Sequence, residues 1–241
     1  MKKKIVFPVI AAAAVGFLIW KFAGGREFLY AGTVEATEVD VSARVGSTIA
    51  AYDAKEGDAV RADQTLVDLS CEDVKLEADI AERDFRRTGD LYKKGSASQE
   101  TFDRDKNRRD TAVLRRDWCS VKSPLDGTVL DKYHEPGELA SPGTKLLTVA
   151  DLRTVWMYVY VPQNLLAKIS VNREVDALLP EAHDRVFKGR ITFIRDEAEF
   201  TPKNVQTREE RTRLVYRVKI EFANADGTLK PGMTLEARLP H

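Results

Sequence analysis

The residues most able to do chemistry in this 241-residue chain are its two cysteines, Cys71 and Cys119. Thiolates ligate metals or form disulfides, but a metal site needs more ligands than this pair, and no histidine is close in sequence to either cysteine. In an oxidising compartment the two make a credible disulfide, and closing a loop of this size would stabilise the fold by roughly 4 kcal/mol. The alternative is two buried thiols that pack as small apolar residues.

The sequence offers no defensible catalytic group. The three histidines, His134, His183 and His241, are isolated, and we expect them at the surface. The chain has no Walker A pattern for phosphate, no His-Glu-x-x-His zinc motif and no Gly-x-Ser-x-Gly nucleophile elbow. Its 38 basic residues balance its 38 acidic residues, so charge does not favour a nucleic-acid partner. We therefore expect a non-enzymatic protein without a cofactor or a metal.

The N-terminal residues have the pattern of an export signal. A basic cluster at residues 2–4 precedes an uncharged stretch, 5–20, which Lys21 closes. The length of this stretch lies between a signal-peptide core and a spanning helix. We favour an uncleaved anchor over residues 1–25, with the basic cluster in the cytoplasm, and the small residues at 23–25 leave cleavage open. Everything after residue 25 is then expected in the periplasm or outside the cell.

An internal repeat becomes visible when the chain is compared with itself at an offset of eighty residues. The matched positions are apolar residues and one turn glycine, namely Val41 with Val121, Thr48 with Thr128, Ile49 with Val129, Gly57 with Gly137, Leu66 with Leu146, Val67 with Leu147 and Leu69 with Val149. Each copy has the pattern of short strands separated by turns. Neither copy can form a core alone, so residues 37–70 and 120–150 are expected to pack face to face as a sandwich. The alternative is a chance similarity between β segments.

Residues 71–119, between the two copies, are rich in charge, contain no proline and have helical periodicity. Apolar and small residues step by four and three along one seam, namely Val74, Ala78, Ala81, Phe85, Thr88 and Tyr92. Gly95 breaks the first helix, and Ser96 with Gln99 offers a capping box for the second. The insertion is therefore predicted to be an antiparallel helical hairpin. Its second arm, Ser98 to Trp118, has a weaker seam, which either needs neighbouring subunits or is solvated.

From Asp151 onward the chain returns to strand patterns, which fall at Thr154–Val161, Glu174–Leu179, Val186–Arg195, Leu214–Phe222 and Thr234–Leu239. A short helix is predicted from Pro162 to Ser170, and a turn from Asn224 to Gly227. Together with residues 26–36, residues 151–241 are expected to form a small β-barrel. The predicted fold class is mainly β with a helical hairpin.

A split sandwich with an inserted hairpin, a following barrel and a preceding anchor resembles the HlyD-type membrane fusion proteins, whose sandwich is lipoyl-like. The local marks are Ser123–Val129, which resembles the entry into the second lipoyl half, and Leu229–Met233, which resembles the last barrel turn. Phe200–Thr207 resembles a barrel loop of the subgroup that works with ABC transporters. This resemblance implies a periplasmic adaptor, anchored in the inner membrane, that links an ABC-type exporter to a TolC-type outer-membrane channel. It also implies a homo-oligomer, a hexamer or trimer of dimers.

At the predicted hairpin tip, Arg87, Leu91 and Ser98 have the spacing of the family's Arg-Leu-Ser motif for docking on TolC-type channels. Arg87 and Leu91 are four residues apart and share a helix face, while Ser98 follows the bend. The tip would present a cation, an apolar side chain and a hydroxyl together. The alternative is a chance spacing in which Leu91 serves the packing of the hairpin itself.

Two other classes of protein compete with the adaptor. A lipoyl or biotinyl carrier domain has a similar sandwich, but it bears a modified lysine in the tight turn that the hairpin here replaces. A structural envelope protein with a helical spike would share the anchor and the hairpin but gives no reason for the tip triplet. The transported substrate, whether drug, peptide or lipid, is not specified by these residues.

Overall fold

The computed structural model describes residues 29–182, 185–200 and 214–239. The N-terminal segment predicted as an anchor, His183, His241 and most of the barrel loop 200–207 lie outside these residues. The chain divides into two compact units. Of the described residues, one unit contains those up to Val34, those between Trp156 and Phe222, and those from Gly232 to Leu239; the other contains Glu35–Val155 and Ala223–Pro231. After the predicted anchor, the sequence predicts three domains, namely the barrel, the sandwich and a separate hairpin. The boundaries of these domains stay a prediction.

The second unit contains a sandwich of two sheets. The first sheet runs β1-β8-β6-β3 in this unit, and the second runs β5-β4-β2-β7. The strands of the first are β1 (Leu29–Ser42), β8 (Lys145–Pro162), β6 (Gly127–Lys132) and β3 (Ala59–Val60). The strands of the second are β5 (Ser120–Lys122), β4 (Thr65–Leu69), β2 (Ser47–Tyr52) and β7 (Leu139–Ala140).

The repeat seen in the sequence relates the two sheets strand by strand. An offset of eighty residues carries β2 onto β6 and β3 onto β7, so the two sheets have equivalent strand orders. The turns correspond as well, because the N–H of Gly57 donates to Val129 O and the N–H of Gly137 donates to Ile49 O, each at 2.8 Å. Both glycines have positive φ, 88° and 96°, which side-chain-bearing residues rarely adopt. The similarity is therefore structural, and the chance alternative is wrong.

The core of the sandwich lies between the two sheets. Equivalent residues of the two halves are buried in this one core, namely Ile49 and Val129, Leu66 and Leu146, Val67 and Leu147, and Leu69 and Val149. Burying one such side chain contributes about 1.5–3 kcal/mol. Each half supplies only part of this apolar surface, which explains why the two halves must fold together.

The first unit is a β-barrel. Its strands follow the order β12-β10-β9-β13-β1-β8, and β12 pairs with β8 to close the ring. The strands that belong to the barrel alone are β9 (Glu174–Leu179), β10 (Arg185–Ile194), β12 (Leu214–Ala223) and β13 (Thr234–Arg238). The short β11 (Glu199–Phe200) pairs with β12. Closure leaves the six barrel strands without a free edge. The barrel predicted from the sequence is confirmed.

The structure corrects two predicted elements in this region. The strand predicted from Thr154 is the second half of β8, which runs without interruption from Lys145 and belongs to both units. The helix predicted from Pro162 to Ser170 is a single turn, α4 (Gln163–Leu166), after which the N–H groups of Lys168 and Ile169 donate only three residues back, to Leu165 O and Leu166 O. Among the described residues, no helix combines the length and the apolar character that a membrane crossing requires.

Candidate docking site at the helical hairpin

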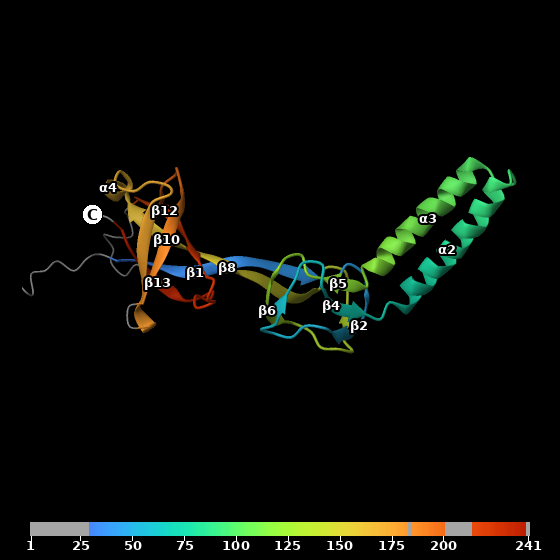
Figure 1. The fold of residues 1–241 in the computed structure, drawn as a ribbon, viewed down its shortest axis with the longest axis horizontal. Coiled ribbons are helices and arrows are strands. Elements are labelled where there is room, and N and C mark those ends of the chain that lie inside the picture. The colour runs from blue at the N-terminus through green and yellow to red at the C-terminus, as the bar shows by residue number, and fades with distance from the viewer. Residues whose placement is uncertain (1–28, 183–184, 201–213, 240–241) are drawn as a thin grey trace, which may run out of the picture. The chain divides into compact units, whose positions relative to one another are not determined.

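The hairpin consists of α2 (Glu72–Lys93), which follows β4, and α3 (Gln99–Asp117), which leads back to β5 (Figure 1). Three alanines, Ala78, Ala81 and Ala112, are buried between the helices and allow the two backbones to approach closely. Because β4 and β5 are antiparallel neighbours, the two helices start from adjacent points of one sheet. The sheet therefore sets the spacing of the hairpin at its base.

Toward the tip, aromatic and polar side chains replace the alanines. The Phe102 ring lies 5.0 Å from the Tyr92 ring and 5.3 Å from the Phe85 ring. Arg109 Cζ is 4.3 Å from the centre of the Phe85 ring, which is the geometry of a cation–π contact. The second arm thus packs on the first through one aromatic residue and polar partners, which is why its apolar periodicity in the sequence is weak.

The bend contains the residues that end α2 and begin α3. The N–H of Gly95 donates to Tyr92 O at 2.9 Å and the N–H of Ser96 donates to Leu91 O at 2.8 Å, a Schellman motif with Gly95 at φ 72°. Ser98, not Ser96, is the N-cap of α3, and its Oγ accepts from the Thr101 N–H at 3.2 Å. The predicted capping box of Ser96 and Gln99 is wrong, because Gln99 is already the first residue of the helix.

The structure places Arg87 and Leu91 on the outer face of α2. Arg87 is exposed, and its guanidinium forms an ion pair with Asp84 Oδ1 at 2.6 Å. Leu91 is 43 % exposed and takes no part in the seam with α3. The alternative that Leu91 serves the packing of the hairpin therefore has no support. Ser98 lies across the bend, and the channel-docking role of the triplet stays a prediction.

Two further apolar residues on the face of Leu91 were missed in the sequence. Leu76 and Ile80 are exposed on α2, and the spacing 76, 80, 87, 91 places all four positions on one stripe opposite the seam. The signal was present in the sequence as a second apolar periodicity. It was hidden because the seam toward α3 has the same repeat.

Cys71 and Cys119 lie at the base of the hairpin and are joined as a disulfide in the structure. Their Cα atoms are 6.1 Å apart, and both residues are buried. Cys71 adopts the left-handed conformation, φ 47°, and its N–H donates to Ser47 Oγ at 2.8 Å. The bond connects the end of β4 to the start of β5, so it would hold the two helix ends together.

The remaining candidates for chemistry do not form a cluster. His134 Nδ1 lies 2.7 Å from Glu138 Oε2, and this hydrogen bond holds the pKa of the Glu138 carboxyl below its ordinary value. Within the described ranges, no group of three or more histidine, cysteine, aspartate and glutamate side chains is placed to hold a metal ion.

Comparison with known proteins agrees with this architecture. Residues 154–241 match the family described as the CusB-like β-barrel domain. The UPF0194 membrane protein YbhG of Salmonella newport is 25 % identical over 324 aligned positions, which cover 99 % of this chain and 98 % of that protein. The membrane fusion protein Spr0693 of Streptococcus pneumoniae has the same fold, with a TM-score of 0.65 over 88 % of this chain and 98 % of that chain at 21 % identity.

In fold the chain is similar to a membrane fusion protein, and its barrel sequence matches the CusB-like family. It also shares its fold with a MacA–MexA chimera carrying the α-hairpin domain of Pseudomonas aeruginosa MexA, with a TM-score of 0.73 over 89 % and 82 % of the two chains at 18 % identity. A more similar but partial match is a UPF0194 membrane protein of Acidithiobacillus ferridurans, 35 % identical over 54 % of this chain and 39 % of that protein. A UPF0194 membrane protein of Citrobacter koseri is 39 % identical over 46 % and 34 % of the two lengths. The chain thus spans about two fifths or less of these two relatives.

Proposed function

We propose that this chain is a membrane fusion protein, a periplasmic adaptor that links an inner-membrane exporter of the ABC type to a TolC-type outer-membrane channel, for efflux or secretion. The observation that carries the proposal is the exposed pair Arg87 and Leu91, four residues apart on the outer face of α2 near the bend. An exposed apolar side chain beside a surface cation, whose ion pair is with Asp84 of the same helix, is suited to a groove between channel helices. Residues 1–25 would anchor the chain in the inner membrane.

The mechanism follows from the separation of tasks along the chain. The barrel would lie at the exporter, the sandwiches of several copies would surround the transport path, and the hairpins would reach the channel. The adaptor itself would make and break no bonds, and the exporter would supply the energy by ATP hydrolysis. A lipoyl-type carrier fits less well, because α2 and α3 occupy the connection between β4 and β5 where such a carrier holds its modified lysine.

The proposal predicts that Arg87→Asp and Leu91→Asp each abolish export while the protein folds normally, because both side chains are exposed and loss of the surface ion pair between Arg87 and Asp84 costs at most about 1 kcal/mol. The matched control is Leu114→Asp, which changes a leucine of α3 that is 50 % exposed, against 43 % for Leu91, and lies near the base of the hairpin. Export by intact cells is measured, with protein level and thermal unfolding as folding checks.

A photoreactive residue at position 91 identifies the partner directly. In intact cells we expect it to capture an outer-membrane channel, and Arg87→Asp should reduce that capture at least tenfold. Export that is normal in both aspartate variants, or capture of soluble proteins alone, would contradict the docking role.

A further inference from the structure

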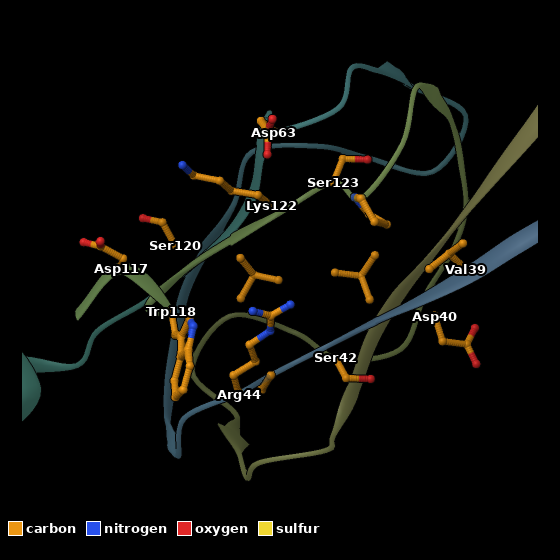
Figure 2. A pocket seen from close by; sticks show the side chains of 14 residues that line it. Val39, Asp40, Ser42, Arg44, Asp63, Asp117, Trp118, Ser120, Lys122 and Ser123 are labelled. Atoms are coloured by element: carbon orange, nitrogen blue, oxygen red, sulfur yellow. The ribbon is translucent and has the colours of Figure 1, made fainter. Parts of the chain in front are cut away.

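One side of the sandwich is open and forms a groove. The groove has a volume of about 550 Å³ and lies between residues 39–44, at the end of β1, and residues 117–124, around β5 (Figure 2). In this unit β1 and β5 are the outermost strands of their sheets, so each borders the groove with an edge that has no neighbouring strand among the described residues. Pockets of this volume are large enough for a small organic ligand.

The floor of the groove is apolar and comes from equivalent positions of the two halves. Val41 of β1 and Val121 of β5 match in the repeat, and both are buried and line the groove. Val39 and Pro124 add to this apolar lining. A ligand with an apolar part would therefore gain free energy by moving that part from water onto the valines.

The groove also contains two side-chain cations. Arg44 reaches into the middle of the groove, and Lys122 comes from β5 (Figure 2). Neither side chain has a hydrogen bond or an ion pair within the part of the chain that the structure describes, and the same holds for the indole N–H of Trp118, which also lines the groove. A guanidinium carries its N–H donors in a planar fork that matches the two oxygens of a carboxylate.

The carboxylates of the groove do not fully offset these cations. Asp40 forms an ion pair with Lys145 at 2.8 Å, and Asp117 lies 3.5 Å from Arg116. Only Asp63 remains without such a partner in the described residues. Two cations against one carboxylate leave one positive charge in excess among the unpartnered side chains, so the groove is complementary to a ligand with one negative charge.

Folding of the sandwich does not require these two cations. The offset of eighty residues carries Arg44 onto Pro124 and Ser42 onto Lys122. The two halves thus build the same strands with a cation in one half and an uncharged residue in the other. The repeat explains the valine floor as shared packing, but it gives no structural reason for the charges, and binding of a ligand would explain them.

We propose that the groove binds an amphipathic monocarboxylate, with its carboxylate on Arg44 and Lys122 and its apolar part on Val41 and Val121. A peptide that adds a strand to the sheet fits less well, because β5 offers an edge of only three residues, Ser120–Lys122. The site belongs to the sandwich, and it does not rest on the docking role proposed for the hairpin tip.

Calorimetry on the full-length protein in phosphatidylcholine nanodiscs tests the site, with the heat from empty nanodiscs subtracted. The probe is 4-phenylbutanoate, and the matched probe is 4-phenylbutan-1-amine, which has the same apolar body and the opposite charge at neutral pH. The carboxylate should bind at least tenfold more tightly than the amine. Equal affinity for the two probes, or no binding of the carboxylate at millimolar concentrations, would overturn the proposal.

Substitutions at Arg44 separate the ligand's charge from its apolar contact. Arg44→Gln should weaken binding of 4-phenylbutanoate at least tenfold, and Arg44→Glu should reverse the preference, so that the amine binds more tightly than the carboxylate. The control is Lys55→Gln, which removes an exposed cation of the same unit outside the groove and should leave binding unchanged. Thermal unfolding checks that all three variants fold. Unchanged binding in Arg44→Gln would refute the role of the guanidinium.

A photoreactive derivative of 4-phenylbutanoate locates the site. After irradiation, mass spectrometry of the digested protein should find the label within residues 39–44 or 117–124, and Arg44→Gln should reduce this labelling at least tenfold. Label confined to other segments would overturn the assignment to the groove. Labelling of the groove does not depend on capture of a channel from position 91, so either proposal can fail while the other holds.

Discussion

At the scale of single residues, the hairpin tip combines exposed groups with groups that hold the tip together. Arg87 and Leu91 are available for a partner, whereas the hydroxyl of Ser98 already caps α3. Ser98 therefore has a structural task besides any contact with a channel. Its two tasks differ chemically, because capping uses the oxygen as an acceptor and docking would also use the O–H as a donor.

This difference leads to a prediction for Ser98. Ser98→Ala should destabilise the first turn of α3 by about 1 kcal/mol, and Ser98→Asp, which keeps an acceptor at the N-cap, should restore most of that stability. Hydrogen exchange of the amide of Thr101 measures the effect. Equal protection in the alanine variant and the unaltered chain would show that the cap contributes nothing. Export by the aspartate variant then reports the docking task alone.

Cys71 and Cys119 act at the other end of the hairpin. Intact mass measured after alkylation without reduction should reveal no free thiol, since the structure joins the two sulfurs. The double variant Cys71→Ser, Cys119→Ser should lower the free energy of unfolding of the sandwich by roughly 4 kcal/mol in the chain-entropy model for this loop. Thermal unfolding measures the loss, and two alkylatable thiols in the periplasmic protein would refute the bond.

At the scale of elements, predictable features were those set by local periodicity. The seam of α2 and the paired strands of the repeat follow from apolar spacing, and the structure contains both. Features that depend on one hydrogen bond between a side chain and the backbone were harder to predict from the sequence. The cap at Ser98 rather than Ser96 depends on where the chain leaves the bend, and either serine satisfies the sequence pattern.

The sequence pattern also did not predict that β8 is one continuous strand. Val149 ends the apolar match of the repeat, and Asp151 and Arg153 resemble a turn between two domains. In the structure these two side chains bind each other, with Arg153 Nη2 2.8 Å from Asp151 Oδ2, and the strand continues. Charged residues occur both in loops and as ion pairs on a continuous strand, so the sequence alone does not distinguish the two cases. Only the pairing of β8 with its neighbouring strands does.

Gly127, at the start of β6, shows how closely the strands of the sandwich approach. A Cβ atom at this position would lie 2.8 Å from Leu125 Cδ1 and still closer to the backbone carbonyl of Ala150. Gly127→Ala should therefore destabilise the sandwich by about 1–3 kcal/mol through overpacking. The matched control is Gly46→Ala, where the nearest atom would be 3.6 Å away. Denaturant unfolding compares the two variants, and equal stability would contradict the close approach.

At the scale of the whole molecule, two strands pass through both units, because β1 and β8 begin or end in the barrel and continue into the sandwich. The hairpin, in contrast, is attached to the sandwich at one place. Its two ends meet at antiparallel neighbours, with Asp68 opposite Ser120 and the N–H of Leu69 donating to Cys119 O. The hairpin therefore forms the connection between β4 and β5, which a short turn could also make.

This arrangement predicts that the hairpin can be removed without unfolding the rest. Replacing residues 70–118 with Asn-Gly, the preferred two-residue turn between antiparallel strands, and changing Cys119 to Ala should leave a folded sandwich and barrel. Circular dichroism should show lost helix with retained strand signal, and unfolding should remain cooperative.

The same variant tests the division of tasks. It should lose export and every crosslink to a channel, because the only proposed contact with the channel lies beyond the turn. A control with the same turn in place of residues 88–98 alone keeps the base of the hairpin and should likewise fold and fail to export. A hairpin-less protein that still exports would show that the sandwich or the barrel contacts the channel, and one that unfolds would show that α2 and α3 stabilise the sandwich on which they stand.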